Sequence, residues 1–316
     1  MTSALLVRGE ELVFFISRAL RSAFTLWAIL TIVFFATRMT GDPTSFLIPP
    51  DFPEEQRMEL RTKLGLDDDL ATQYIRYGAA LLRGDFGQSF FSNRPVVDLF
   101  LERVPNTLLL TIPAFVLSVI IGMGAGLWAA LHHNTVFDRS LTTATIVGQA
   151  IPNFVVGIAA ILIFSFSFKL LPSGGMGTWK HLILPAITLA LHTSANIARL
   201  VRSSMLEVLS QDYMRYARSK GLSPFSVVVK HGLRNAILPV LTILGLQLGG
   251  LIAGAVVTES VFAWPGAGRL VIDAVMQRDF AMLQFGILVF SAAVIFTNLL
   301  VDVGYGLLDP RVRGRS

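Results

Sequence analysis

Residues Pro105–Leu131 read PNTLLLTIPAFVLSVIIGMGAGLWAAL and contain no Asp, Glu, Lys or Arg. A helix needs about 20 residues to cross some 30 Å of hydrocarbon, and a charge at mid-bilayer costs about 2.5–3.5 kcal/mol on insertion scales. Five further stretches are also charge-free: Ser22–Thr37, Ser140–Phe168, Leu182–Ala198, Asn235–Thr258 and Phe280–Val301. Their continuous apolar character excludes the alternating pattern of a membrane barrel. The sequence therefore predicts an all-α polytopic membrane protein with six transmembrane helices.

The composition of the 316 residues agrees with this fold class, since 53% are hydrophobic and only 15% are charged. Soluble domains average about 25% charged residues. There is no cysteine, which excludes a disulfide framework and a thiol-based metal or redox site. The five histidines are scattered, and we expect no metal site.

Basic residues in the loops predict the orientation. In Arg199–Arg234, Lys and Arg outnumber the acidic Glu207 and Asp212, and further arginines occupy both termini. These three segments are expected in the cytoplasm, and an even number of six spans allows all three to lie on one side. The net charge of +5 then reflects the membrane topology and does not indicate a nucleic-acid surface. Bulky Phe34 and Phe35 occupy the place where small residues would precede a signal cleavage site, so we expect a retained first helix.

These boundaries predict a cell (inner) membrane protein in five parts. They are a cytoplasmic segment 1–21, a first transmembrane helix 22–38, an extracytoplasmic helical insertion 39–104, a core 105–306 with five transmembrane helices, and a cytoplasmic tail 307–316. Within the insertion, Pro53–Leu64 and Leu70–Leu82 are typical of helices.

The segment Met205–Leu241 is too polar to insert and too apolar for a loose linker. Its apolar residues Leu206, Leu209, Tyr213 and Tyr216 recur at the spacing of one helix. Gly221 can end that helix in a left-handed cap, and Ser223-Pro224 can begin another. The second helix would carry Phe225, Val228 and Val229 toward a partner, and Pro239 would open or kink the fifth span. The pattern predicts a helix–turn–helix knob beneath the membrane.

The run RYARSKGL at Arg215–Leu222, followed by KHGLRNAILP at Lys230–Pro239, resembles the "EAA" loop of ABC-importer permeases. We place this loop at 205–234. Its form is similar to that of the dipeptide/oligopeptide (peptide/nickel) family, in the first-permease type of subunit, although Arg215 stands where the general loop has Glu. Other matching elements are Gly41-Asp42-Pro43, Leu64–Asp67, Gln73-Tyr74, Gly84–Ser89, Pro105–Leu108 and Leu308–Arg311.

The resemblance implies a type I ABC-importer transmembrane domain that is not itself an enzyme. It implies a heterodimer with a second, related permease, two cytoplasmic ATPase subunits that bind ATP and Mg, and an extracytoplasmic substrate-binding protein. This chain would bind no cofactor. The sequence independently lacks the G-x-x-x-x-G-K-[ST] phosphate loop and any Gly-Lys pair.

The expected cargo is a dipeptide or oligopeptide, with a nickel chelate, glutathione or a sugar as alternatives. An ion-coupled carrier is a further alternative, against which stands the lack of charged residues deep in any span. A non-transport scaffold or secretion component also stays open.

Two sets of candidate site residues follow. The expected ATPase-coupling surface comprises Asp212, Tyr213, Ala217, Lys220, Gly221 and Leu222. Gln149, Asn153 and Gln247 are candidates for the translocation pathway, with interhelical packing as the alternative. Packing also competes with a partner contact for the glycines of the second and fifth spans. Glu259 and Trp264–Gly268 are expected in the loop after the fifth span, as a re-entrant turn or a rigid loop.

Overall fold

The computed structural model describes residues 2–39, 53–63 and 65–308. Within these ranges the regular structure is helical, and the only β-type pairing is an isolated bridge between Gln88 and Pro95. The chain divides into two compact units. One unit runs up to Pro105 and includes Gly266–Ala292, and the other comprises Asn106–Pro265 and the residues from Ala293 onward. The predicted all-α class is confirmed.

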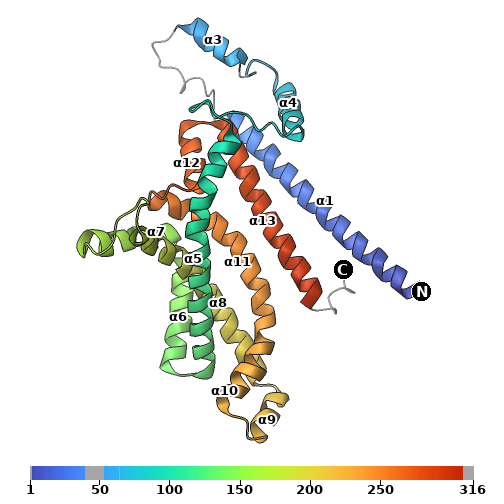
Figure 1. The fold of residues 1–316 in the computed structure, drawn as a ribbon, viewed down its shortest axis with the longest axis vertical. Coiled ribbons are helices and arrows are strands. Elements are labelled where there is room, and N and C mark those ends of the chain that lie inside the picture. The colour runs from blue at the N-terminus through green and yellow to red at the C-terminus, as the bar shows by residue number, and fades with distance from the viewer. Residues whose placement is uncertain (1, 40–52, 64, 309–316) are drawn as a thin grey trace. The chain divides into compact units, whose positions relative to one another are not determined.

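The first unit contains the amino-terminal part of the chain and a later helical hairpin. Its elements are α1 (Thr2–Met39), α3 (Glu54–Lys63), α4 (Leu70–Leu82), the start of α5 (Val96–Leu131), α12 (Ala267–Gln277) and the start of α13 (Phe280–Leu308). Its core is formed by Val96 and Phe100 of α5, Val271 of α12, and Met282 and Phe285 of α13. These elements are labelled in Figure 1.

The helices predicted in the insertion are confirmed, as Glu54–Lys63 and Leu70–Leu82. Asp69 caps α4 by accepting hydrogen bonds from the hydroxyl and backbone N–H of Thr72, at 2.6 and 3.1 Å. These bonds hold the pKa of the Asp69 carboxyl below its usual value. The elements Gly41-Asp42-Pro43 and Asp309–Arg311, and the arginines of the tail, lie outside the described residues.

The second unit is organised around the long helix α8 (Trp179–Leu209). Besides the rest of α5 and α13, it contains α6 (Val136–Ala150), α7 (Asn153–Ala160), η1 (Ile161–Ser167), α9 (Asp212–Ser219), α10 (Pro224–Ser226), η2 (Val227–Leu233) and α11 (Arg234–Val261). Helix α8 contacts α6, α7 and α11, with its largest contact to α11. One core joins Leu110, Leu189 and Leu251 from α5, α8 and α11.

Five described helices are long and apolar enough to cross a membrane: Ile16–Met39, Val96–Leu131, Trp179–Leu209, Pro239–Val261 and Phe280–Val301. A sixth span exists only if the bent pair Val136–Ala150 and Asn153–Ser167 is counted as one. The predicted span over Ser140–Phe168 is therefore a bent pair of helices and not one unbroken helix.

The bend between α6 and α7 is 101° and falls at Ile151–Pro152 (Figure 1). Pro152 has no N–H to donate, and its ring disfavours helical geometry in the residue before it. Ile151 accordingly has extended angles, φ −88° and ψ 122°. One proline thus divides an apolar run that composition alone presents as uninterrupted.

Helices α5 and α8 approach closely at Gly122 and Gly126. A Cβ on Gly126 would lie 2.4 Å from the Ala198 carbonyl oxygen and 2.9 Å from Cβ of Val201. A Cβ on Gly124, which faces away, would meet no atom within 4 Å. Small residues permit such contacts in membrane proteins. For Gly122 and Gly126, packing within this subunit is confirmed.

We expect Gly126→Ala to lower the thermal midpoint of the detergent-solubilised protein, because the added methyl overlaps backbone atoms of α8. Overpacking of this kind costs about 1–3 kcal/mol. Gly124→Ala is the matched control on the same helix and should leave the midpoint unchanged. Equal midpoints for the two variants would contradict the α5–α8 contact.

Candidate functional site

The polar segment between α8 and α11 folds into a compact unit, residues 211–233, which we call the knob. Its core consists of the buried side chains Met214, Ala217 and Val227, against which Val208 and Leu209 of α8 pack. Gly232 completes the contact, since a Cβ there would lie 3.3 Å from Cε of Met205. The knob is therefore folded onto the end of α8 (Figure 1).

The helix predicted through Leu206, Leu209, Tyr213 and Tyr216 is interrupted, and this part of the prediction is wrong. Helix α8 ends at Leu209, and α9 begins at Asp212 after an extended Gln211. The Ser210 hydroxyl donates to the Glu207 carbonyl at 2.7 Å. Serine side chains can compete in this way with helical hydrogen bonds, and the helix ends here without a proline or glycine.

The turn inside the knob agrees with its predicted chemistry. Gly221 has φ +73°, and its N–H donates to the Arg218 carbonyl at 3.0 Å. Ser223 caps α10 by accepting from the Ser226 N–H, and Pro224 occupies the first turn. A Cβ on Gly221 would meet nothing within 4 Å. There is thus space for a side chain at this position. Glycine is favoured because the backbone is left-handed, a conformation that residues with a side chain rarely adopt.

The knob exposes an aromatic and apolar surface. Phe225 is 77% exposed, and Tyr213, Tyr216, Leu222 and Val229 are also exposed. The Lys220 ammonium lies 4.6 Å from the centroid of the Tyr216 ring. Large exposed side chains in one patch are typical of protein interaction sites. Val228, by contrast, packs against the core of α8.

Of the six predicted coupling residues, Asp212, Tyr213, Lys220, Gly221 and Leu222 are exposed, whereas Ala217 is buried. Ala217 thus lies inside the knob rather than on its surface. The amide nitrogen of Asn235 donates to the Tyr213 hydroxyl at 3.0 Å, which links α9 to α11. Pro239 lies within α11 and does not begin it.

The three predicted pathway residues lie in two places. Gln149 and Asn153 flank the bend at Pro152, and Gln247 lies in α11. Asn153 approaches α11, because its side-chain nitrogen would lie 3.8 Å from a Cβ on Gly254. The side-chain nitrogen of Gln149 is buried without a hydrogen-bond partner among the described residues. Whether these groups line a pathway stays a prediction.

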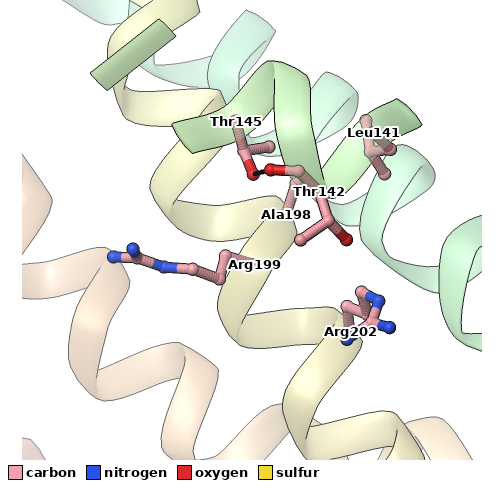
Figure 2. Close-up of a pocket in the computed structure, with 6 residues that line it drawn as sticks. All are labelled: Leu141, Thr142, Thr145, Ala198, Arg199 and Arg202. Atoms are coloured by element: carbon pink, nitrogen blue, oxygen red, sulfur yellow. Dashed lines mark hydrogen bonds between the residues drawn. The ribbon is translucent and has the colours of Figure 1, made fainter. Parts of the chain in front are cut away.

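A small pocket lies between α6 and α8, as Figure 2 shows. It is lined by Leu141, Thr142, Thr145, Ala198, Arg199 and Arg202. Its volume is about 30 Å³, which leaves room for only a few water molecules. The pocket is therefore too small to hold a peptide.

Glu259 was expected in a loop, and the structure corrects this. It lies in the last turn of α11 with 0% of its surface exposed, and it accepts a hydrogen bond from the Thr107 hydroxyl at 2.6 Å. Nearby, the indole N–H of Trp264 donates to the Asn106 carbonyl, and the Asn106 amide donates to the Pro265 carbonyl, both at 2.8 Å. These bonds join α5 to the last turn of α11 and to the loop that follows it. The charge-free stretch Asn235–Thr258 ends one residue before Glu259, so the absence of charge alone places Glu259 outside the helix.

A bundle of apolar helices with a folded knob between two of them defines a class: a polytopic membrane protein with a small folded unit between two of its long helices. The chain belongs to the family of binding-protein-dependent transport system inner membrane components, whose model matches residues 122–314. It is 43% identical over 290 residues to the glutathione transport system permease protein GsiC of Escherichia coli (strain K12), covering 92% of this chain and 95% of the relative. The GsiC of Shigella flexneri serotype 5b (strain 8401) has the same identity and coverage.

Solved structures give the same fold. An amino acid ABC transporter chain superposes with a TM-score of 0.52 at 20% identity, covering 66% of this chain and 94% of its own. A chain of the inward-facing MetNI methionine ABC transporter superposes with a TM-score of 0.56 at 17% identity, covering 68% of this chain and 98% of its own. The predicted fold of an ABC-importer transmembrane domain is confirmed.

Family membership confirms the main functional prediction. The chain is a non-catalytic permease subunit of an ATP-driven, binding-protein-dependent importer, and it is a multi-pass protein of the inner membrane. The names of the relatives do not separate the first from the second permease of a pair. The assignment to the first type stays a prediction.

We expect Thr107→Val to destabilise the protein, because it removes a hydrogen bond to the buried Glu259 carboxylate. Hydrogen bonds to charged groups are worth about 1.5–3 kcal/mol. Thr111→Val is the control, since the Thr111 hydroxyl donates only to the Thr107 carbonyl of its own helix. Thermal unfolding in detergent should show a larger loss for Thr107→Val, and the reverse order would contradict the interhelical role.

Proposed function

We propose that this chain pairs with a second, related permease to form the pathway of an importer of short peptides, and that the knob is the site where a cytoplasmic ATPase docks. The observation that carries the proposal is the knob itself, a small folded unit with an exposed aromatic surface around Phe225 and Tyr216. Such a surface suits a groove in a soluble protein. ATP and Mg²⁺ would be bound by two such ATPase subunits.

The proposed coupling is mechanical. Helix α8 is continuous over 31 residues, from Trp179 to the edge of the knob at Leu209. A displacement of the knob during ATP-driven closure is carried along α8 and α11, because close-packed helices do not deform continuously. The bundle then changes between inward-open and outward-open states, whose populations nucleotide shifts by binding them differently.

The orientation follows from charge. The knob carries Arg215, Arg218 and Lys220 on exposed positions, which supports a cytoplasmic location by the positive-inside rule. An even number of spans then places both termini in the cytoplasm. The insertion that contains α3 and α4 would face the opposite side, where a substrate-binding protein delivers its ligand.

The proposed cargo class rests on the relatives. They are named for glutathione, a tripeptide, and the likeness extends over 92% of the chain. A dipeptide, an oligopeptide or glutathione fits this class, and other small solutes are the alternative. Mass spectrometry of the ligand that co-purifies with the cognate binding protein tests it, and a sugar or metal chelate there would overturn the peptide assignment.

We expect Gly221→Pro to abolish transport and retention of the ATPase while membrane insertion persists. Proline fixes φ near −65°, whereas this turn has φ +73°. Gly221→Asn is the matched control, because asparagine tolerates left-handed geometry better than other side chains. Transport assays and co-purification are the measurements. Normal transport by Gly221→Pro with its ATPase bound would show that the knob is not the coupling site.

Phe225→Ala should weaken ATPase binding about tenfold or more without lowering the thermal midpoint, because the ring is exposed in the isolated chain and buried only on docking. Aromatic anchors of interfaces commonly cost 2 kcal/mol or more on truncation. Leu82→Ala is the control, since Leu82 is 92% exposed on α4, away from the knob in sequence. Equal binding by both variants would remove Phe225 from the interface.

A further inference from the structure

Asp138, in the first turn of α6, is a carboxylate with 2% of its side chain exposed. Arg202 of α8 donates to both of its oxygens, from Nε at 2.5 Å and from Nη2 at 2.8 Å. The backbone N–H of Asn134 donates at 3.0 Å, and Nδ1 of His133 lies 3.2 Å away. A bidentate arginine on a buried carboxylate is a strong and directional contact.

Helix α6 packs against α8, and Asp138 is its most buried side chain. Its buried residues are Asp138 and Thr145, and both are polar. Ile146 and Val147 are exposed, as are Val136 and Phe137 in its first turn. Next to the ion pair the interface with α8 is open, because the pocket of Figure 2 is lined by Arg202 and by Leu141 and Thr142 of α6. No apolar side chain of α6 is fully buried, so the ion pair is the buried side-chain contact that adds to the packing of α6 against α8 at this level.

The pair lies between two features of the proposed mechanism. Arg202 is seven residues before the end of α8 at Leu209, where the knob begins. Asp138 is on the helix that leads to the bend at Pro152, beyond which α7 contacts α8 and α11. A shift of the knob-bearing end of α8 can reach the bend by two routes, directly through the contact of α7 with α8 and through α6 if α6 moves with α8.

We propose that Asp138 and Arg202 are a positioning pair that makes α6 and α8 move as one body, so that a displacement of the knob shifts the bend at Pro152. The inference rests on the proposed function, because it takes the knob as the point where work enters. Separation of the two groups would leave the buried carboxylate without its arginine, with the Asn134 N–H and His133 as its remaining partners, and breaking a buried ion pair is unfavourable. The pair is thus suited to be a fixed strut rather than a contact that opens in each cycle.

The first test measures coupling in the complete transporter, reconstituted in vesicles with its ATPase and binding protein. We expect Asp138→Asn and Arg202→Lys to reduce the amount of solute transported per ATP hydrolysed about tenfold, while the ATPase stays bound and hydrolyses ATP. Arg199→Lys is the matched control on the same face of α8, where the arginine contacts only Asn196 at 3.4 Å among its described partners, and it should transport normally. An unchanged ratio in both pair variants would overturn the proposal.

The second test measures movement and does not depend on transport. The chain contains no cysteine, so Ser140→Cys on α6 and Ser203→Cys on α8 provide two unique, exposed attachment sites for spin labels. In the wild-type background we expect the same distance distribution in the nucleotide-free and the ATP-bound complex. With Arg202→Lys the distribution should broaden or shift between the two states. A large shift in the wild-type background would show that the helices separate, and would overturn the strut.

The two proposals fail in different ways. If the ATPase does not co-purify with the wild-type chain, or if Gly221→Pro transports normally, the proposed coupling site is wrong. If the ATPase binds and responds to the knob variants, but the Asp138 and Arg202 variants keep the wild-type transport ratio, only the positioning pair is wrong.

Discussion

Hydrocarbon offers no hydrogen-bond partner, so a chain that crosses it must satisfy every backbone N–H and carbonyl group internally. This constraint leaves helices as the elements of the structure and makes each departure from a helix informative. The bend at Ile151–Pro152 and the π-helix η1 that follows it interrupt the apolar run between Val136 and Ser167. Irregular backbone at membrane depth is tolerated where protein or a water-filled cavity covers it, and α7 indeed contacts α8 and α11.

The same constraint decides what holds the helices together. Lipid is as apolar as leucine, so association depends on close packing and on polar contacts between helices. Close packing dominates between α5 and α8, at Gly122 and Gly126. Apolar cores join α5, α8 and α11, and polar contacts add to them at Thr107 with Glu259 and at Asp138 with Arg202. Each of these ties joins segments far apart in the sequence, which makes the second unit a connected frame rather than a row of separate spans.

The sequence predicted the features that depend on local chemistry. Charge-free length marked the apolar helices, and Gly221 with Ser223-Pro224 marked the turn of the knob, because a left-handed glycine and a capped proline act within a few residues. The bend at Pro152 also has a local signal, the proline itself, but the absence of charge over Ser140–Phe168 does not report it. The break between α8 and α9, at Ser210–Gln211, contains neither proline nor glycine.

The remaining differences between the predictions and the structure arise from tertiary contacts. The burial of Glu259 depends on Thr107, which is 152 residues away in the chain, and no local pattern reports such a partner. Ala217 has the spacing of an exposed position in a sequence of charged neighbours, yet it faces Met214 and Val227. The exposed knob residues were accessible to sequence reasoning because their motif is continuous, whereas Asp138 and Arg202 are separated by 64 residues and were not singled out.

In the proposed mechanism the coupling element must be stiff as well as exposed, and the knob is small. Only Met214, Ala217 and Val227 form its own buried core. Val208 and Leu209, however, pack against that core and also against the larger one that contains Met205, Val201 and Ala236. The two cores are therefore continuous through the last turn of α8. Work applied to the exposed rings of the knob is not absorbed by a flexible connection, because the knob and the helices that leave it share the same packed side chains.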